Sequence, residues 1–471
     1  MKYLYLYFFL TVSWSLNLLA LPLDIENLKL FEPQSQGMKN TMSIELDEVI
    51  TQFIEDEKIQ GAVVAVSRFG NPIYFSAHGL ADVPKKIAME KDSMFQMWSS
   101  TKPVLGVAAM IAIERGLFSP EDEVGKYLPN FNGIEVAVLD DPKDKDISPL
   151  GVYTQMGGET GFFSSLYWRV WSWFSDGYYI GYIPERRLVK SNKPITIHHL
   201  LTHTAGLGTN GLGQAIAPWN GKLTSSKDGG TKEENAFLND VTIGSLTDMI
   251  SEGPLDFQPG SRFSYSGFMG LDVVAHIIEI TSGQPFDEFV KTNIFDPLYM
   301  HDTYWNVPSE KFNRIVSISG GGQDGSKPAG ETKFFSGSVG LISTAKDYLH
   351  FENMLLNKGE FLGQRILSEA AVNLMSTNQI GDLFSKQNPK VKEGSEGFGY
   401  TVSVTLDPEK ASLKRGKGSF GWAGAAGTIS WTDPENDINV VIMVQQPTKE
   451  FSEAIARVVF NSVNREIKII Q

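Results

Sequence analysis

Apolar residues recur at helical spacing near the N-terminus and then give way to runs typical of strands. Between residues 42 and 59 one face of the predicted helix is apolar, formed by Ile44, Leu46, Val49, Ile50, Phe53 and Ile54. This period predicts an amphipathic helix. The following segment, 61–79, holds two β-rich runs separated by Arg68-Phe69-Gly70-Asn71. Two such runs around a glycine-containing turn predict a β-hairpin.

The other end of the chain shows a similar pattern in reverse order. The segments 397–406, 427–433 and 438–446 are predicted to be strands, and 449–467 is predicted to be a closing helix. Strands at both ends with helical segments between them favour an α+β fold. We expect one antiparallel sheet built from both chain ends and packed against a helical lobe.

This pattern divides the chain into two lobes of a single catalytic domain, residues 21–471. The sheet lobe comprises about 40–95 and 390–471, and the helical lobe about 96–389. An active site is expected between the lobes. Because no period of 20 to 50 residues is visible, the chain is not a repeat protein.

Two middle segments depart from the periodic pattern. Residues 138–193 form an insertion with ten aromatic residues gathered in its centre, which fits either a packed sub-core or an apolar flap over a substrate. Residues 209–239 are rich in glycine and lysine and are predicted to form a long loop. The sequence leaves the role of the aromatic insertion open.

The first twenty residues predict a signal peptide. Lys2 precedes an uncharged apolar stretch that ends near Ala20, before the first acid at Asp24. The expected location is therefore secreted or periplasmic. An uncleaved membrane anchor is the alternative, since the length suffices and the small-residue cleavage pattern is weak.

Charge and cysteine content narrow the range of partners. The formal net charge is −14, and without a run of basic residues this argues against nucleic acid as a partner. No stable membrane partner is expected after cleavage of the signal peptide. The chain has no cysteine, so neither disulfides nor cysteine-linked lipids can form.

Several motif matches carry no function. The seven histidines show no metal-ligand spacing, so neither a metal site nor a cofactor is expected. The dinucleotide-like run at 206–211 does not lie between a strand and a helix. The stretch 198–206 is interpreted as a helix end, with His203 in the last turn and Gly206 as the cap.

Serine and lysine three residues apart occur twice. On a helix this spacing places both side chains on one face, so lysine could accept the serine proton. Ser99 and Lys102 lie at the start of a nearly all-apolar predicted helix. Burying a lysine there costs free energy, which a functional role would explain. Ser343 and Lys346 begin an ordinary amphipathic pattern, and Ser343 is interpreted as a helix N-cap.

Two further segments supply partners for the first pair. Tyr265 lies in a Tyr-Ser-Gly turn ahead of another apolar helix, and a glycine-rich strand edge contains Trp422 and Gly424. Glycine at such an edge lets a backbone N–H group approach a substrate carbonyl closely.

With these segments the sequence resembles a known family, the serine hydrolases of the class C β-lactamase and D-alanyl-D-alanine carboxypeptidase type, which includes β-lactamase-fold esterases. The resemblance extends from about residue 44 to 446 and rests on "SSTKPVLGVAAMIAIERGLFSPEDEVGKYLPNF", "ITIHHLLTHTAGL", "PGSRFSYSGFMGLDVVAHIIEITSGQPF" and "GLISTAKDYLHFENMLLNKG". It implies a β-lactamase/transpeptidase-like fold with Ser99 as nucleophile, Lys102 as base and Tyr265 as acid and base. The N–H groups of Ser99 and Ala425 would form the oxyanion hole.

Departures from the family pattern bear on the substrate. In the β-lactamase members of the family the second motif is Tyr-x-Asn, and the third opens with lysine or histidine before a Thr-Gly or x-Gly pair. Here Gly267 stands in place of the asparagine, and Trp422 stands in place of the cation. Recognition of a carboxylate is therefore not expected. With Gly424, these residues are predicted to contact a small-molecule ester or amide substrate. The predicted function is a secreted serine esterase.

Two alternatives to the esterase stay open. One is a D-amino-acid peptidase, a D-Ala-D-Ala carboxypeptidase or a β-lactamase. The other is a non-catalytic binding member of the same fold, in which the aromatic insertion docks a partner.

Overall fold

The computed structural model describes residues 28–139, 186–208, 241–267, 269–318 and 331–464. The predicted signal peptide, most of the aromatic insertion and the predicted loop at 209–239 lie outside the described residues. Within the described part no helix is long and apolar enough to cross a membrane.

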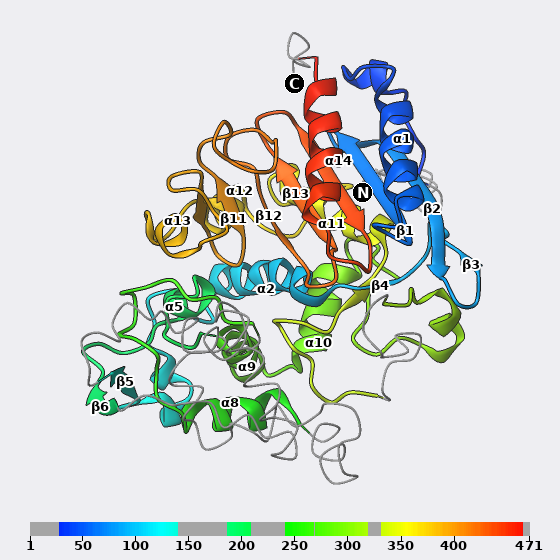
Figure 1. Cartoon of the computed structure of the whole chain (residues 1–471). Coiled ribbons are helices and arrows are strands. Elements are labelled where there is room, and N and C mark those ends of the chain that lie inside the picture. Colours follow the sequence, from blue (N-terminus) through cyan, green and yellow to red (C-terminus); the bar gives the residue numbers. More distant parts are fainter. Residues whose placement is uncertain (1–27, 140–185, 209–240, 268, 319–330, 465–471) are drawn as a thin grey trace, which may run out of the picture.

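The main sheet has eight strands that come from both ends of the chain (Figure 1). Its spatial order is β10 (Glu396–Phe398), β11 (Ser403–Thr405), β12 (Phe420–Ala423), β13 (Ile429–Asp433), β14 (Ile438–Met443), β1 (Gly61–Arg68), β2 (Asn71–Asp82) and β3 (Ile87–Ala88). All neighbouring pairs are antiparallel. The predicted α+β fold with a sheet built from both termini is therefore confirmed.

The central strand β1 is buried on both faces, and its side chains alternate between two cores. Val63 and Ala65 belong to the larger core on one side, whereas Ala62, Val64 and Val66 belong to the second core on the other. Successive side chains of a strand point to opposite faces of the sheet. This explains why the β1 sequence is almost uninterruptedly apolar.

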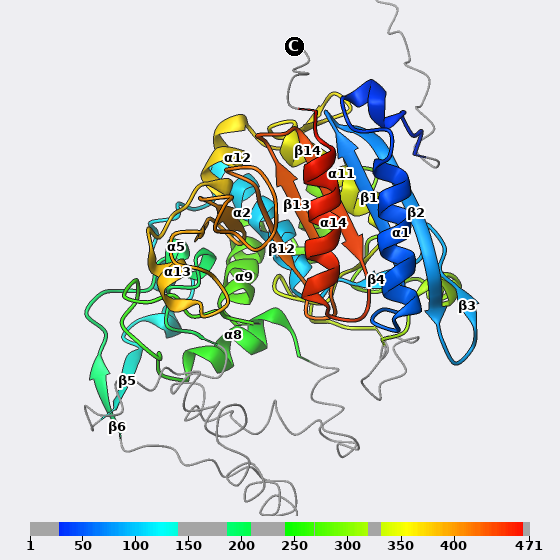
Figure 2. The ribbon, with the colours of Figure 1, turned by 45° about the horizontal axis from the view of Figure 1, so that its top comes forward.

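Two terminal helices cover one face of the sheet. Helices α1 (Met42–Glu55) and α14 (Lys449–Ser462) lie side by side over it, and the rings of Phe53 and Phe451 are 5.2 Å apart (Figures 1 and 2). Both helices were predicted, and Leu46 and Ile50 face the core as expected. Ile44, also assigned to the apolar face, is instead 60 % exposed.

The opposite face packs against α2 (Lys102–Glu114) and α11 (Ala345–Leu356). Every residue of α2 from Lys102 to Ala112 is buried, so this helix forms the centre of the larger core. The remaining helices of the described chain are α5 (Ile197–Leu201), α8 (Ile243–Ser251), α9 (Gly270–Ser282), α10 (Phe286–Val290), α12 (Glu369–Ser376) and α13 (Leu383–Gln387).

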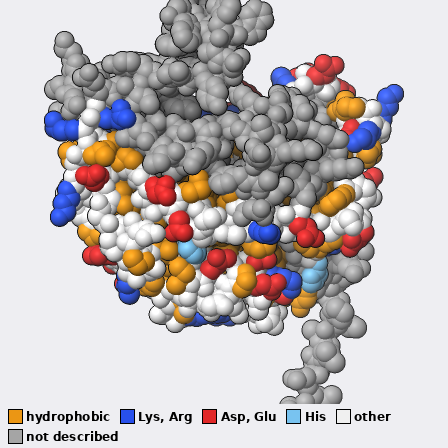
Figure 3. Space-filling model, turned by 90° about the horizontal axis from the view of Figure 1, so that it is seen from below, with side chains coloured by type: hydrophobic (Ala, Val, Ile, Leu, Met, Phe, Trp, Pro, Cys, Tyr) orange, Lys and Arg blue, Asp and Glu red, His pale blue; other side chains and the backbone are white. Residues whose placement is uncertain are grey.

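Short elements complete the described chain. Three two-stranded ladders are β4 (Phe95–Gln96) with β7 (Ile342–Ser343), β5 (Glu135–Leu139) with β6 (Arg186–Lys190), and β8 (Glu360–Phe361) with β9 (Gln364–Arg365). The short helical turns are η1 (Pro33–Gln36), η2 (Trp98–Thr101), η3 (Val124–Lys126), η4 (Pro129–Phe131), η6 (Lys291–Phe295) and η7 (Ser309–Arg314). Seen from below, the described surface mixes acidic, basic and apolar side chains (Figure 3).

Three local predictions were wrong. The strand predicted over 397–406 is two strands, β10 and β11, joined by a turn in which Thr401 has φ +69°. Ser343 does not cap α11; Thr344 does, by accepting a hydrogen bond from the Asp347 N–H, while Ser343 lies in β7. The helix at 198–206 ends at Leu201 rather than near Gly206.

A buried carboxyl group joins α11 to the sheet. The two oxygens of Glu352 accept hydrogen bonds from the hydroxyls of Ser430 and Thr432 on β13, each at 2.6 Å. Burial raises the pKa of Glu352 to about 7, against the ordinary 4.5. Because the folded state holds this proton more tightly than the unfolded state, the stabilisation is complete below pH 4.5 and is lost as the pH rises through 7.

Replacing this group should make folding less dependent on pH. Between pH 5 and pH 8 the free energy of unfolding of the parent should fall more than that of Glu352→Gln, by on the order of 2 kcal/mol. Urea denaturation at both pH values measures the difference. Glu48→Gln, at an exposed site on α1, is the control and should behave as the parent. Equal pH dependence in the parent and Glu352→Gln would contradict the assignment.

Candidate active site

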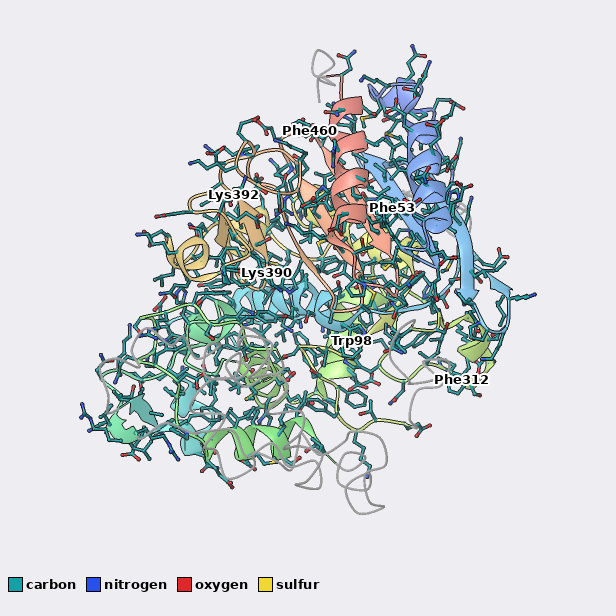
Figure 4. All side chains as sticks on the ribbon, in the orientation of Figure 1. Phe53, Trp98, Phe312, Lys390, Lys392 and Phe460 are labelled. Carbon is teal, nitrogen blue, oxygen red and sulfur yellow. The ribbon has the colours of Figure 1, made fainter. Side chains whose placement is uncertain are left out.

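Ser99 lies in a strained turn directly before the N-terminus of α2. Trp98 has φ +48°, a left-handed conformation that is unusual for a bulky residue. The chain leaves β4, turns at Trp98 and enters α2 through η2, so Trp98 lies at the end of α2 that adjoins β4 (Figure 4). Neighbouring backbone groups fix the turn: the Met97 N–H donates to Leu341 O at 2.8 Å, and the Tyr348 hydroxyl donates to Ser100 O at 2.5 Å.

The Lys102 side chain is fully buried and its amine touches three oxygens. Lys102 Nζ lies 2.7 Å from Gly267 O, 2.9 Å from Ser338 O and 3.1 Å from Ser99 Oγ. The two carbonyls can only accept hydrogen bonds. An ammonium would donate to all three oxygens, whereas a neutral amine would donate to the two carbonyls and turn its lone pair toward the serine hydroxyl. In the neutral form this set of partners fits a base.

Burial shifts the protonation equilibrium of this amine toward the neutral form. Desolvation by burial lowers the pKa of Lys102 from its ordinary 10.5, and the nearby Tyr265 and Asp272 oppose this shift. A lysine held in this way can accept a proton at a lower pH than a lysine in water.

Tyr265 lies on the other side of the serine. Its hydroxyl donates to Ser99 Oγ at 2.7 Å, and its ring centre lies 5.1 Å from Lys102 Nζ. The Trp422 indole N–H donates to the Tyr265 hydroxyl at 3.4 Å, and the two rings are 5.5 Å apart. The Ser99 hydroxyl can thus accept a hydrogen bond from the phenol while it offers its own proton to Lys102.

His203 holds the turn that carries Tyr265, a role the sequence analysis missed. Its carbonyl accepts from the Ser264 N–H at 3.0 Å and its Nδ1 accepts from the Ser266 N–H at 3.2 Å. Its ring meets the Tyr265 ring edge-on at 4.9 Å. Burial lowers the pKa of His203 well below 6.5, so the ring is neutral and Nδ1 can accept.

The pattern of residues 198–206 could not reveal this role of His203. Its helix-end interpretation placed His203 in helical backbone, whereas the residue has φ +56°. This left-handed backbone conformation, which histidine adopts more readily than most residues, accompanies both contacts with the tyrosine turn. The neighbouring glycine in the motif is a signal of a turn, but not of its partner.

The predicted strand edge packs directly against the nucleophile turn. A Cβ on Gly424 would lie 2.3 Å from both Met97 O and Thr428 Oγ1, so only glycine fits there. The sequence analysis gave this glycine a role in substrate approach, and the structure adds a contact within the protein. Ala425 follows in the exposed turn after β12.

The structure thus brings Ser99, Lys102, Tyr265, Gly267 and Trp422 into one contiguous set of contacts, with Gly424 packed behind it. Among the described residues no group of three or more histidine, cysteine or acidic side chains could hold a metal ion. The chemistry available from the contacts is proton transfer around a serine hydroxyl.

Comparison with known proteins shows which family the chain resembles along most of its length. A model of the Beta-lactamase family matches residues 46–462. Esterase EstB of Burkholderia gladioli is 25 % identical over 428 residues, which cover 86 % of this chain and 90 % of that protein. Lovastatin esterase of Penicillium rubens is 24 % identical over 434 residues, covering 85 % and 92 %.

Solved structures show the same fold. EstCE1, described as a hydrolase with promiscuous acyltransferase activity, superimposes with a TM-score of 0.66 at 24 % identity, covering 89 % of this chain and 99 % of that one. The predicted β-lactamase/transpeptidase-like fold and the family resemblance are both confirmed. The chain belongs to the Beta-lactamase family and is a serine hydrolase.

Proposed function

We propose that this protein hydrolyses carboxylic esters through an acyl-enzyme formed on Ser99. The observation that carries the proposal is the pair of contacts at the serine hydroxyl, with Lys102 Nζ at 3.1 Å and the Tyr265 hydroxyl at 2.7 Å. A nucleophile within reach of a buried amine and a phenol has both a base and an acid at hand.

In the first half-reaction Ser99 Oγ attacks the ester carbonyl carbon while its proton passes to the neutral Lys102. The ester carbonyl oxygen becomes an oxyanion, and the C–O bond to the alcohol then breaks. Tyr265 supplies the proton that the leaving alkoxide needs and regains one from the Lys102 ammonium, whose Nζ lies 5.1 Å from its ring centre. The products of this step are the acyl-Ser99 ester and a free alcohol.

In the second half-reaction water attacks the acyl-Ser99 carbonyl. Tyr265 passes its own proton to the neutral Lys102 as it takes the proton of the attacking water, and the ammonium then returns a proton through Tyr265 to Ser99 Oγ as the oxygen leaves. The acid is released and the starting protonation state is restored. The hydrogen bond from Trp422 to the Tyr265 hydroxyl would stabilise the phenolate that forms during this transfer.

The oxyanion is assigned to the N–H groups of Ser99 and Ala425. The packing of Gly424 against Met97 supports this assignment, because it brings the turn after β12 next to the turn that carries Ser99. Backbone N–H groups fixed in this way need no reorganisation when the negative charge develops.

Two residues support an uncharged substrate. Gly267 gives its carbonyl to Lys102 and has no side chain with which to bind a substrate amide. By the family resemblance Trp422 takes the place of the cation that binds a substrate carboxylate, and its indole donates to Tyr265. The names of the two esterase relatives, EstB and lovastatin esterase, point the same way.

The apolar N-terminal segment 1–20 supports export as a further part of this proposal.

A hydrolysis panel tests the choice of substrate. The parent should hydrolyse p-nitrophenyl esters of different chain length at least about a hundredfold faster, by kcat/KM, than a cephalosporin or a D-Ala-D-Ala peptide, because Trp422 offers no charge to a carboxylate. Ser99→Ala should lose at least about a thousandfold in kcat, and Ser343→Ala, the other Ser-x-x-Lys serine, should retain the parent's rate. Faster turnover of the peptide would favour a carboxypeptidase instead.

A single methyl group tests the oxyanion assignment. Gly424→Ala places a Cβ against Met97 O and should displace the turn that carries Ala425, lowering kcat for a neutral ester roughly a hundredfold. Gly244→Ala in α8 is the matched control, because its Cβ would make only ordinary contacts of 3.5 Å or more. An unchanged kcat in Gly424→Ala would refute the close packing from which the oxyanion hole is derived.

A further inference from the structure

Asp272 is a fully buried carboxyl group whose place in the fold none of the steps above explains. It lies in the first turn of α9 and has no exposed surface. Its oxygen Oδ1 accepts hydrogen bonds, whereas Oδ2 is buried without a hydrogen-bond partner among the described residues. A carboxylate with half of its acceptor capacity unused costs stability.

The carboxyl group connects to Lys102 through a continuous chain of hydrogen bonds. Asp272 Oδ1 accepts from the Ser336 hydroxyl at 2.7 Å, and Ser336 Oγ accepts from the Val339 N–H at 3.1 Å. The Val339 N–H and the Ser338 carbonyl belong to the same peptide group. That carbonyl accepts from Lys102 Nζ at 2.9 Å. Three hydrogen bonds therefore link the carboxylate to the amine.

Residues 336–339, which carry this chain of hydrogen bonds (the relay), pack between α2 and α9. A Cβ on Gly337 would lie 2.9 Å from the Leu105 side chain of α2 and 3.2 Å from the Ala275 side chain of α9. A second hydrogen bond, from the Ser338 N–H to Asp272 Oδ1 at 3.2 Å, ties the same segment to the carboxylate. The peptide that faces Lys102 has little freedom to turn away.

A negative charge at one end of such a chain acts on the other end. The carboxylate polarises the Ser336 hydroxyl, the hydroxyl polarises the 338–339 peptide, and the peptide carbonyl becomes a stronger acceptor. A stronger acceptor favours the ammonium form of Lys102 over the neutral form. The charge itself acts in the same direction across the buried interior, where screening by water is weak.

We propose that Asp272 is a positioning residue which, through Ser336 and the 338–339 peptide, holds Lys102 against Ser99 and stabilises the ammonium ion that forms when Lys102 takes the serine proton. This inference deepens the proposed function and rests on it. No bond to the substrate is involved: the serine proton moves to Nζ, and Asp272, whose pKa burial raises to about 6, acts as a carboxylate above that pH.

The groups around Lys102 decide in which direction loss of the Asp272 charge shifts the pH dependence of the Ser99 reaction. The titratable groups facing Lys102 are Tyr265, Asp272 from α9, and His203, which is neutral. Burial lowers the pKa of Lys102, and Asp272 opposes part of that shift. Without the carboxylate charge this pKa falls further, so the neutral amine persists to lower pH. The acid limb of the pH profile, where the rate of reaction at Ser99 falls as Lys102 becomes protonated, must then move to lower pH.

The rate of labelling of Ser99 by a fluorophosphonate probe, measured from pH 4 to 10, tests this directly. In Asp272→Asn, which keeps the acceptor Oδ1 and removes the charge, the acid limb should move down by about one pH unit. The plateau rate should fall roughly tenfold, because the ammonium is less well stabilised. Ser336→Ala, which breaks the relay and keeps the carboxylate, should move the limb the same way by a smaller amount.

Asp347 on α11 offers a matched control. It too is buried, burial raises its pKa to about 6 as for Asp272, and one of its oxygens has no hydrogen-bond partner among the described residues. Its bonded oxygen accepts from the Asp302 N–H and the Thr303 hydroxyl, away from Lys102. Asp347→Asn should therefore reproduce any cost of losing a buried charge while leaving the acid limb unchanged.

The outcomes separate this inference from the proposed function. A limb that stays in place in Asp272→Asn, or moves equally in Asp347→Asn, overturns the role of Asp272 and leaves the nucleophile assignment intact. If Asp272→Asn does not fold, an unmoved limb in Ser336→Ala has the same meaning. A parent chain that the probe does not label at any pH overturns the proposed function, and the role of Asp272 with it.

Discussion

The burial of one amine is the constraint on which the rest of the site depends. Lys102 has no exposed surface, and its Nζ is held by two carbonyl oxygens and one hydroxyl. An amine taken out of water is costly unless its N–H groups are paired, whether it is neutral or charged. The fold meets this cost with carbonyls from two separate segments, at Gly267 and Ser338, which lie 165 and 236 residues away along the chain.

The sheet and the helical lobe each contribute to the positioning of Ser99. From the sheet side, Gly424 of the β12 edge packs on Met97, and Thr428 Oγ1 donates to Met97 O at 3.1 Å. From the helical side, α2 starts at Lys102, and the turn that carries Tyr265 is held by His203. Since Ser99 lies where these contacts meet, a displacement on either side changes its geometry.

The sequence revealed the parts of the fold that depend on periodic patterns. The helix at 42–55, the hairpin of β1 and β2, and the pairing of both chain ends in one sheet follow from apolar spacing and turn chemistry. Contacts made by backbone atoms could not be predicted from the sequence. The acceptors of Lys102 at Gly267 and Ser338 are carbonyls, which every residue has, so no side chain signals them.

The errors have related physical causes. Ser343 and Thr344 can both cap a helix, and only the backbone conformation decides that Thr344 does so. His203 was given a helical conformation because its neighbours are helical, yet tertiary contacts hold it left-handed. Asp272 lies in an apolar helix pattern where an acid in the first turn is ordinary. Its connection to Lys102 depends on a segment more than sixty residues further along.

The central claim is that Ser99 carries the acyl group during turnover. Acid quenching of the reaction with p-nitrophenyl butyrate, followed by proteolysis and mass spectrometry of the peptides, tests it most directly. We expect a butyryl group on the peptide that contains Ser99 and none on the peptide that contains Ser343. A butyryl group found on any other residue, or continued turnover by Ser99→Ala, would contradict it.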